Sequence, residues 1–315
     1  MSSSTSSLST FAGPPRRRRR RVRLATIGGA LVLAGGLLGP TLATASPLSD
    51  PQEPNTTAAK AGVERGNATM GWRDGVQRTG VARAAGDTRV TAASKVTRAG
   101  KLVPMTGVVG IDVSSYQGVV DWVSFTKVKR SFAYVKATEG TSYRNPFYAS
   151  QYGGAKTAGM FAGAYHFANP SGKSGKKQAT YFVQNGGAWR NDGKTLPGVL
   201  DIEYNPYGGT MCYGLSKKKM VAWITDFLVT YKKLTTRDAV IYTTADWWST
   251  CTGNTTKFRS TNPLWAARWT PKTGAGKLPG GWSYYTFWQY SATVIDQNRF
   301  SNTAARLKVL ATNGK

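Results

Sequence analysis

From residue 108 onward, short runs of β-branched and aromatic residues alternate with longer segments that have a helical hydrophobic period. The clearest helix is predicted over residues 216–234, where Ser216 can cap the first turn and apolar side chains recur at i+3, i+4, i+7, i+8 and i+11 from Met220. Seven strands are predicted, over residues 108–113, 132–137, 161–167, 198–203, 239–243, 264–267 and 284–290. Alternating strands and helices are typical of parallel βαβ units.

The predicted helices become sparse after about residue 245, where strands follow one another through loops. A closed α/β barrel with irregular final repeats fits this order better than a flat doubly wound sheet, partly because no GxGxxG motif follows the first strand. We therefore expect an irregular TIM-like α/β barrel over residues 105–315.

The first 104 residues lack this pattern. Six consecutive arginines at 16–21 precede an uncharged apolar stretch at 24–38, and small residues follow at positions 43 and 45. This order predicts a signal peptide over residues 1–45, with an uncleaved membrane anchor as the alternative. Residues 46–104 are rich in Ala, Thr, Gly and Arg without a sustained period, which predicts a disordered linker or pro-segment. We expect a secreted protein, extracellular or cell-wall associated, without a membrane span after signal cleavage.

The 315 residues include 42 Lys and Arg against 15 Asp and Glu, a formal net charge of +27. Removing residues 1–45 deletes seven arginines and no acid, so the exported chain has a charge of 35 − 15 = +20. Such a charge could indicate nucleic-acid binding, but an exported protein first meets anionic polymers of the cell surface. We predict no nucleic-acid partner.

Histidine and cysteine are scarce. One histidine, His166, and two cysteines cannot form a conventional Cys/His zinc site, and no HExxH motif is present, so no metal is predicted and metalloproteases are excluded. Gly172 and Gly193 each precede Lys and a hydroxyl residue but lack the earlier glycine of a phosphate-binding loop, so no nucleotide cofactor is predicted. Because export leads to an oxidising compartment, Cys212 and Cys251 are predicted to form a disulfide, with two free thiols as the alternative.

Four carboxylates fall at or near predicted strand ends: Asp112, Asp201, Glu203 and Asp296. Active sites of parallel α/β barrels lie at these ends, so the four side chains would converge on one cleft. Asp201 and Glu203 are spaced i, i+2 and would project from one face about 6–7 Å apart. Two carboxylates so close do not both ionise readily, which leaves a proton for the general acid of a glycosidase. A pair neutralised by Lys or Arg, or a cation site, is the alternative.

Large aromatic side chains accompany these acids at or just beyond the predicted strand ends: Tyr116, Tyr165, Tyr204, Trp265, Trp269, Trp288 and Tyr290. Their rings could stack on sugar rings, although about half of them are expected to belong to the core. His166 is expected to be a hydrogen-bonded structural residue, because no GxSxG motif supports a Ser-His-Asp triad.

Eight motifs, in this order, resemble the glycoside hydrolase family 25 lysozymes, especially secreted muramidases of Streptomyces-like bacteria. They are GIDVSSYQG (110–118), YVKATEG (134–140), GAYHF (163–167), LDIE (200–203), IYT (241–243), LWAARW (264–269), FWQYS (287–291) and IDQNRF (295–300). The resemblance covers about residues 106–312. It implies an irregular (β/α)5(β)3 barrel and hydrolysis of the β-1,4 bond between N-acetylmuramic acid and N-acetylglucosamine in bacterial peptidoglycan.

The resemblance also implies residue roles. Glu203 would be the proton donor and later the base, and Asp201 would orient or stabilise the 2-acetamido group of the substrate. Asp112 and Asp296 match two further acids that tune charge and bind sugar. Further substrate-binding or supporting residues are expected among Tyr116, Tyr165, Tyr204, Trp265, Trp288 and Tyr290. The carboxylate spacing does not choose between a carboxylate nucleophile and substrate assistance, and we favour substrate assistance.

Peptidoglycan glycan strands are the expected partner of a monomeric enzyme. The positive charge predicts salt-sensitive adsorption to anionic polymers of the cell wall. Two other functions fit the same residues: a cationic wall-binding protein without activity, and an N-acetylglucosaminidase or chitinase on the same fold. Retention of all four acids disfavours the first, and the sugar at each new reducing end would distinguish the second.

Overall fold

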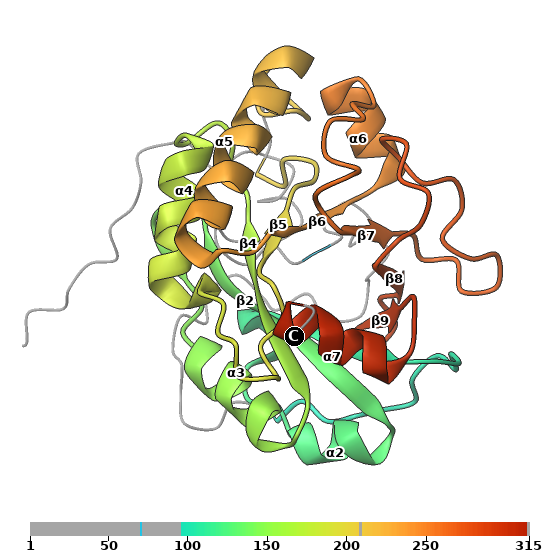
Figure 1. The fold of residues 1–315 in the computed structure, drawn as a ribbon. Helices are drawn as coiled ribbons and strands as arrows, with labels where there is room; N and C mark the ends of the chain where they lie inside the picture. The colour runs from blue at the N-terminus through green and yellow to red at the C-terminus, as the bar shows by residue number, and fades with distance from the viewer. Residues whose placement is uncertain (1–69, 71–95, 208–209, 314–315) are drawn as a thin grey trace, which may run out of the picture. The chain divides into compact units, whose positions relative to one another are not determined.

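The computed structural model describes residues 70, 96–207 and 210–313, so the predicted signal peptide and most of the predicted linker lie outside the described residues. The described chain forms one sheet with the strand order β1-β9-β8-β7-β6-β5-β4-β2-β3, in which β1 also pairs with β2. This last pairing closes eight strands into a barrel, and β3 extends β2 at the rim (Figure 1). The predicted irregular α/β barrel is confirmed.

The strands are β1 (Val109–Val113), β2 (Arg130–Glu139), β3 (Tyr143–Arg144), β4 (Phe161–Phe167), β5 (Val199–Asp201), β6 (Val240–Thr243), β7 (Leu264–Ala267), β8 (Phe287–Ser291) and β9 (Asp296–Phe300). The helices are η2 (Ser115–Gln117), α2 (Trp122–Lys127), α3 (Tyr148–Thr157), α4 (Gly175–Phe182), η3 (Val183–Gly187), α5 (Lys217–Thr235), α6 (Ala245–Thr252) and α7 (Ala304–Thr312). All barrel pairings are parallel except those of β9, which runs antiparallel to both β8 and β1.

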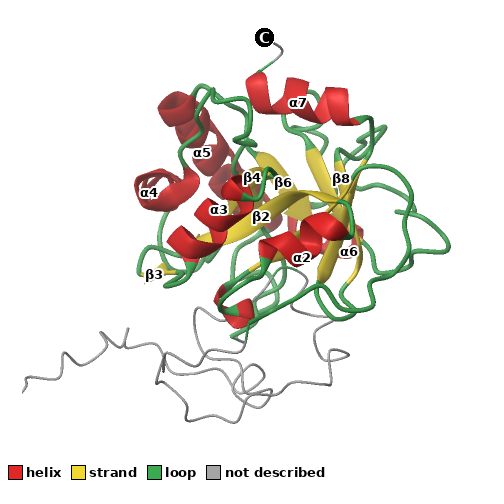
Figure 2. Cartoon of the chain, turned by 90° about the horizontal axis from the view of Figure 1, so that it is seen from below, coloured by secondary structure: helices red, strands yellow, loops and turns green. Residues whose placement is uncertain are grey.

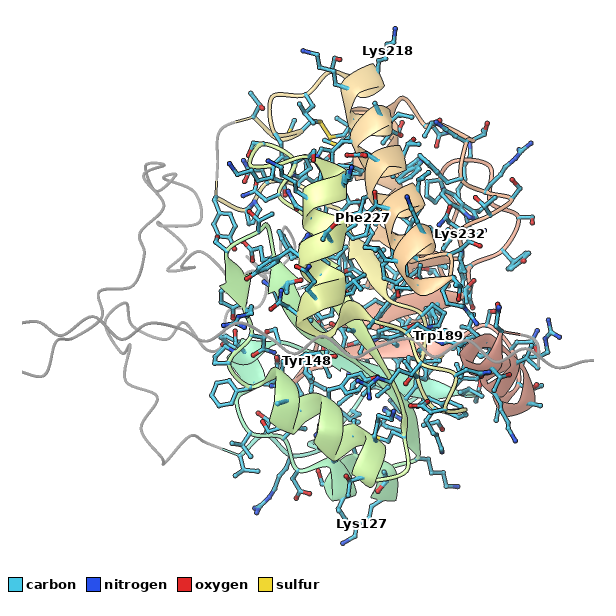
Figure 3. All side chains as sticks on the ribbon, turned by 60° about the vertical axis from the view of Figure 1, so that its left-hand side comes forward. Lys127, Tyr148, Trp189, Lys218, Phe227 and Lys232 are labelled. Carbon is cyan, nitrogen blue, oxygen red and sulfur yellow. A yellow bond between two sulfur atoms is a disulfide. The ribbon has the colours of Figure 1, made fainter. Side chains whose placement is uncertain are left out.

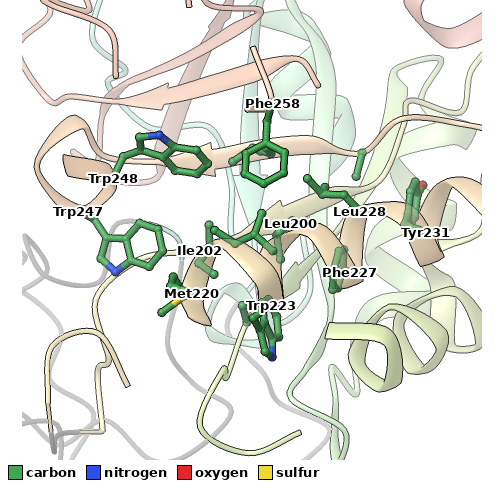
Figure 4. Close-up of a cluster of buried hydrophobic side chains, with 14 of the residues drawn as sticks. Leu200, Ile202, Met220, Trp223, Phe227, Leu228, Tyr231, Trp247, Trp248 and Phe258 are labelled. Carbon is green, nitrogen blue, oxygen red and sulfur yellow. The ribbon is translucent and has the colours of Figure 1, made fainter. Parts of the chain in front are cut away.

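Helices α4, α5 and α6 cover the outer face of the sheet around β4–β7. The Ser216 side chain accepts a hydrogen bond from the backbone of Lys219 and begins α5 where the sequence predicts it. Figure 4 shows the apolar face of α5 packed against outward-facing side chains of the β5 region. The buried side chains there include Leu200, Ile202, Met220, Trp223, Phe227, Leu228, Trp247, Trp248 and Phe258. Each contributes about 1.5–3 kcal/mol by burial, which makes this layer a main source of stability.

The interior of the barrel at the N-terminal ends of the strands is filled by four rings, which we name the aromatic floor: Phe132, Tyr134, Trp265 and Phe287. The ring centroids of Tyr134 and Trp265 are 4.9 Å apart, a separation typical of packed aromatic pairs. A Cβ atom at Gly163 would lie 2.0 Å from the Tyr134 ring, so only glycine allows the ring to lie there. Helix α7 lies across this end (Figure 2) and buries Leu307 against the same cluster.

Residues 96–104 pack on the outer face of β1 and β9. Thr97 forms a bridge with Val120, and the backbone N–H of Val103 donates to Gln297 Oε1 at 3.0 Å. Leu102 packs against the cluster that contains Ile111 and other outward-facing side chains. The described part of the expected linker is therefore hydrogen-bonded to the barrel. None of the helices in residues 96–207 and 210–313 is long and apolar enough to cross a membrane.

Candidate active site

Asp112, Asp201, Glu203 and Asp296, which we name the acidic cluster, all face the interior at the end of the barrel opposite α7. On β1, Ile111 and Val113 pack outside, which directs Asp112 inward. On β5 and the residues after it, Leu200 and Ile202 pack outside, so Asp201 and Glu203 point inward. Asp296 pairs with Asp112 across β9 and β1. The four side chains are between 0% and 3% exposed.

The surroundings of the Tyr165 hydroxyl indicate that the four side chains of the acidic cluster lie near one another. Burial raises the pKa of its hydroxyl well above the ordinary value of 10, and the negative charges of all four carboxylates raise this pKa further. The hydroxyl is buried and has no hydrogen-bond partner among the described residues. The structure therefore brings the four predicted acids and Tyr165 together in one site.

Asp112 is held by two amide side chains. Its Oδ2 atom accepts hydrogen bonds from Gln289 Nε2 at 2.9 Å and from Asn298 Nδ2 at 2.7 Å. Gln289 in turn accepts from the hydroxyl of Tyr242, and Asn298 accepts from the indole N–H of Trp265. These bonds fix both amides with their donors toward Asp112.

Asp201 and Glu203 form a coupled pair. Burial raises the pKa of Asp201 well above its ordinary value of 3.8, and the charge of Glu203 raises it further. A side-chain hydrogen bond between Asp201 and Glu203 also raises the pKa of Asp201, and among the described residues no other group donates to the Asp201 carboxyl. A carboxyl group in this setting favours its neutral form, so the pair retains one proton at higher pH than two isolated carboxylates would. General acid catalysis needs such a proton.

Two charged residues of this site are not among the predicted site residues. Lys136 is fully buried, and its ammonium lies 2.7 Å from Glu139 Oε2 and 5.1 and 4.9 Å from the ring centroids of Tyr143 and Phe167. The Lys136 ammonium lies over the ring of Phe167, which pairs with Asp201 across β4 and β5, and its positive charge acts against the rise in the pKa of Asp201. The available signal was a Lys directly after the apolar run 132–135, with a Glu three residues later.

The predicted aromatic residues occupy three different settings. Tyr116 is 48% exposed on η2, beside the C-terminal end of β1. Trp265 belongs to the aromatic floor and is fully buried. Tyr204 packs in the outer cluster around α5, and its hydroxyl donates to Asp246 Oδ2 at 2.6 Å.

Trp288 and Tyr290 lie on the outer face of β8, because their neighbours Phe287 and Gln289 face inward. The indole N–H of Trp288 donates to the carbonyl oxygen of Arg268, and the Tyr290 hydroxyl donates to that of Val103. The structure therefore does not bring these two side chains to the acidic cluster. Trp269 is closer to it, since its indole N–H donates to Gln289 Oε1 at 3.0 Å.

His166 lies on the outer face of β4. Its Nδ1 atom is 2.8 Å from Thr138 Oγ1, and its Nε2 atom is 3.0 Å from Gln178 Oε1. Burial lowers the pKa of the imidazole to about 4, so the ring is neutral at pH 7. These contacts give His166 a structural role.

The predicted disulfide between Cys212 and Cys251 is confirmed, with the two Cα atoms 5.4 Å apart. It joins the loop after Glu203 to α6 and so restrains the chain beside the acidic cluster. No group of three His, Cys, Asp or Glu side chains in the described chain is arranged to hold a metal ion.

Comparisons with known proteins confirm the family resemblance. The model of "Glycosyl hydrolases family 25" matches residues 111–298. Lysozyme M1 from Streptomyces globisporus is 51% identical over 216 residues, which cover 66% of this chain and 72% of that protein. An N,O-diacetylmuramidase from Chalaropsis sp. is 45% identical over 209 residues, which cover 64% of this chain and 98% of that protein. A bacterial lysozyme structure from Streptomyces coelicolor aligns with a TM-score of 0.65 at 50% identity, covering 67% of this chain and 100% of that one. Because the family match spans more than half of its length, this chain belongs to glycosyl hydrolases family 25.

Proposed function

We propose that this glycoside hydrolase cleaves the β-1,4 bond between N-acetylmuramic acid and N-acetylglucosamine in peptidoglycan, with Glu203 as general acid and base and Asp201 assisting. The relatives named lysozyme and N,O-diacetylmuramidase support this substrate. The observation that carries the assignment of residues is the buried Asp201–Glu203 pair at the C-terminal end of β5, where burial and mutual repulsion retain a proton.

In the first step, the single proton of the pair is on Glu203, which leaves Asp201 ionised, and Glu203 donates this proton to the glycosidic oxygen as the bond to the anomeric carbon breaks. The oxygen of the 2-acetamido group attacks this carbon, and Asp201 stabilises the positive charge that develops on the acetamido nitrogen. In the second step, the Glu203 carboxylate takes a proton from a water molecule, which attacks the same carbon. This attack breaks the bond between the acetamido oxygen and the anomeric carbon and restores the 2-acetamido group. The negative charges of Asp112 and Asp296 stabilise the oxocarbenium-like transition states of both steps.

Purified peptidoglycan provides the test. We expect residues 46–315 to clear it and to leave muramic acid at each new reducing end, identified by mass spectrometry after borohydride reduction. Glu203→Gln should abolish nearly all release, whereas Asp238→Asn, at a surface ion pair with Lys232, should retain it. A Glu203→Gln enzyme with most of its activity would overturn the assignment. Glucosamine ends would indicate a glucosaminidase, and wall binding without new ends would indicate a non-catalytic binding protein.

We also propose that the secreted chain adsorbs to anionic wall polymers through its surface charge. Residues 105–315 include 26 Lys and Arg against ten Asp and Glu. The acidic cluster and Glu139 are buried, so half of these acids lie inside the barrel. Figure 3 shows Lys127 and Lys218 pointing away from the protein. Sedimentation of the monomeric protein with cell walls should decrease as salt rises from about 0.05 to 0.5 M, and retention that is independent of salt would contradict the proposal.

The organisation of the N-terminal region is also proposed from its sequence: residues 1–45 as a signal peptide and residues 46–104 as a linker or pro-segment. Mass spectrometry of the protein recovered from the culture medium would test both boundaries. An N-terminus near Ser46 supports cleavage of the signal peptide alone. An N-terminus near residue 96 would assign residues 46–95 to a removed pro-segment, because residues 96–104 are bonded to the barrel.

A further inference from the structure

Lys136 is a buried cation on the inner face of β2. Phe132 and Tyr134, at positions 4 and 2 residues earlier, belong to the aromatic floor, so the alternation of β2 directs Lys136 inward on the side of the acidic cluster. Strand alternation would place a residue three positions later on the opposite face. The register shift between Lys136 and Thr138 breaks the alternation and allows Glu139 to reach the ammonium at 2.7 Å.

Stability does not explain this pair. Taking two charges out of water costs free energy that their attraction rarely exceeds, and apolar side chains of similar volume are often as stabilising. The Lys136 ammonium lies over the rings of Tyr143 and Phe167, a setting that would accept an apolar side chain. The fixed charge at this position therefore requires another explanation.

The surroundings of Lys136 are strongly acidic. The titratable groups that face this end of the barrel are Asp112 on β1, Glu139 on β2, Tyr143 on β3, Tyr165 on β4, Asp201 and Glu203 at β5, Tyr213 in the following loop, Tyr242 on β6 and Asp296 on β9. Five are carboxylates, whereas Lys136 is the one Lys or Arg that the described contacts place among them. His166 lies beyond it on the outer face of β4 and is neutral.

We propose that Lys136 is a positioning residue, whose ammonium sets the pH range over which the Asp201–Glu203 pair holds a single proton. This inference rests on the proposed function, since that mechanism requires one proton on the pair. A nearby positive charge favours loss of both protons, and a nearby negative charge opposes it. Lys136 thus shifts both ionisations of the pair to lower pH, and Glu139 limits this shift while holding the ammonium in place.

The pH dependence of kcat/KM for peptidoglycan tests this role with three variants of the full exported chain. Lys136→Met removes the positive charge and should move both limbs of the bell-shaped profile up by about one pH unit. Glu139→Gln removes the negative charge and should move both limbs down by a similar amount. The double variant removes both charges together, so its profile should return toward that of the wild type.

These outcomes separate an electrostatic role from damage to the fold. Loss of packing lowers activity at every pH and does not move the limbs in opposite directions, and urea unfolding of each variant identifies those that do not fold. If Lys136→Met does not fold, the direction of the Glu139→Gln shift decides alone. Unmoved limbs in folded variants, with active wild type, would overturn the role of Lys136 only. An inactive wild type would overturn the proposed function itself.

Discussion

The two ends of the barrel interior are formed by the same eight strands but bury opposite kinds of side chain, aromatic rings at one end and carboxylates at the other. At the end covered by α7, the aromatic floor packs rings with centroids about 5 Å apart and is closed by apolar side chains of the helix. At the other end, the acidic cluster is equally buried but contains repelling carboxylates, and in the described chain the Asp201 carboxyl is hydrogen-bonded to Glu203 but accepts from no other donor. One end therefore gains stability from burial, and the other places buried charge where it costs stability.

A polar layer joins the two ends. Trp265 of the floor donates to Asn298, and Asn298 donates to Asp112 of the acidic cluster. The rigid rings therefore fix the direction of an amide, and the amide fixes a carboxylate. Stability and function are separated by position along the barrel axis, which is the pattern expected when a strained site is supported by a well-packed scaffold.

The largest expected effect is at Asp201. Asp201→Asn should lower kcat/KM on peptidoglycan by about 10³-fold, since the assisting carboxylate is lost. Its folded pKa is raised, so the wild type loses stability as pH rises above the unfolded value of 3.8, and the variant does not. Urea unfolding at pH 4 and pH 7 should show the variant gaining relative stability at the higher pH. A variant that is active, or that loses stability relative to the wild type at pH 7, would contradict the view that the acidic end serves activity at a cost in stability.

The aromatic floor should respond in the opposite way. Trp265→Ala should lower the free energy of unfolding by about 3–5 kcal/mol, because it leaves a cavity among fully buried rings. Trp265→Phe retains a ring and should cost about 1–2 kcal/mol through the lost hydrogen bond to Asn298. Chemical denaturation measures both. An equal loss in the free energy of unfolding for the two variants would show that packing of the aromatic floor does not stabilise the protein.

Part of this fold could be predicted because its buried segments are continuous apolar runs in the sequence. Strands β4 and β7 agree residue for residue with the hydrophobic pattern, and Ser216 marks the start of α5. Strand β9 was not predicted, because Asp296 and Gln297 give it polar side chains on both faces. Strand β8 ends at Ser291, just before β9 begins, but the other partner, β1, is distant in sequence, so the pairing that closes the barrel could not be predicted from the hydrophobic pattern.

The same limit applies to the site. The acids could be predicted, since carboxylates at apolar strand ends are exceptional. The inward face of β8 could not, because a strand pattern does not say which alternating set faces the interior; Gln289 faces Asp112, whereas Trp288 and Tyr290 face outward. Lys136 and Glu139 are recognisable in the sequence as charges beside an apolar run, but strand alternation would place them on opposite faces, and the irregular register that joins them could not be predicted.

His166 tests whether the contrast extends to the outer layer. It lies beside the acidic cluster in the sheet but on the outer face, so its titration should affect stability and not activity. Its folded pKa of about 4 is below the unfolded value of 6.5, so the stability it contributes is present above pH 6.5 and is lost as pH falls toward 4. The loss is about 3 kcal/mol. His166→Gln should remove this part of the pH dependence of urea unfolding, and an unchanged dependence would contradict the assignment.

The smallest expected effect is at the polar layer itself. Asn298→Ala removes the donor at 2.7 Å from Asp112 and the acceptor for Trp265, so both ends lose one hydrogen bond. Because Gln289 still donates to Asp112, we expect a loss of about 2 kcal/mol in stability and about tenfold in kcat/KM. Asn262→Ala, which removes a buried amide that donates to the backbone of Ala239, is the matched control and should lower stability without lowering activity. If both variants lower activity equally, the loss reflects general destabilisation; if only Asn298→Ala does, the floor orients the carboxylate through this amide.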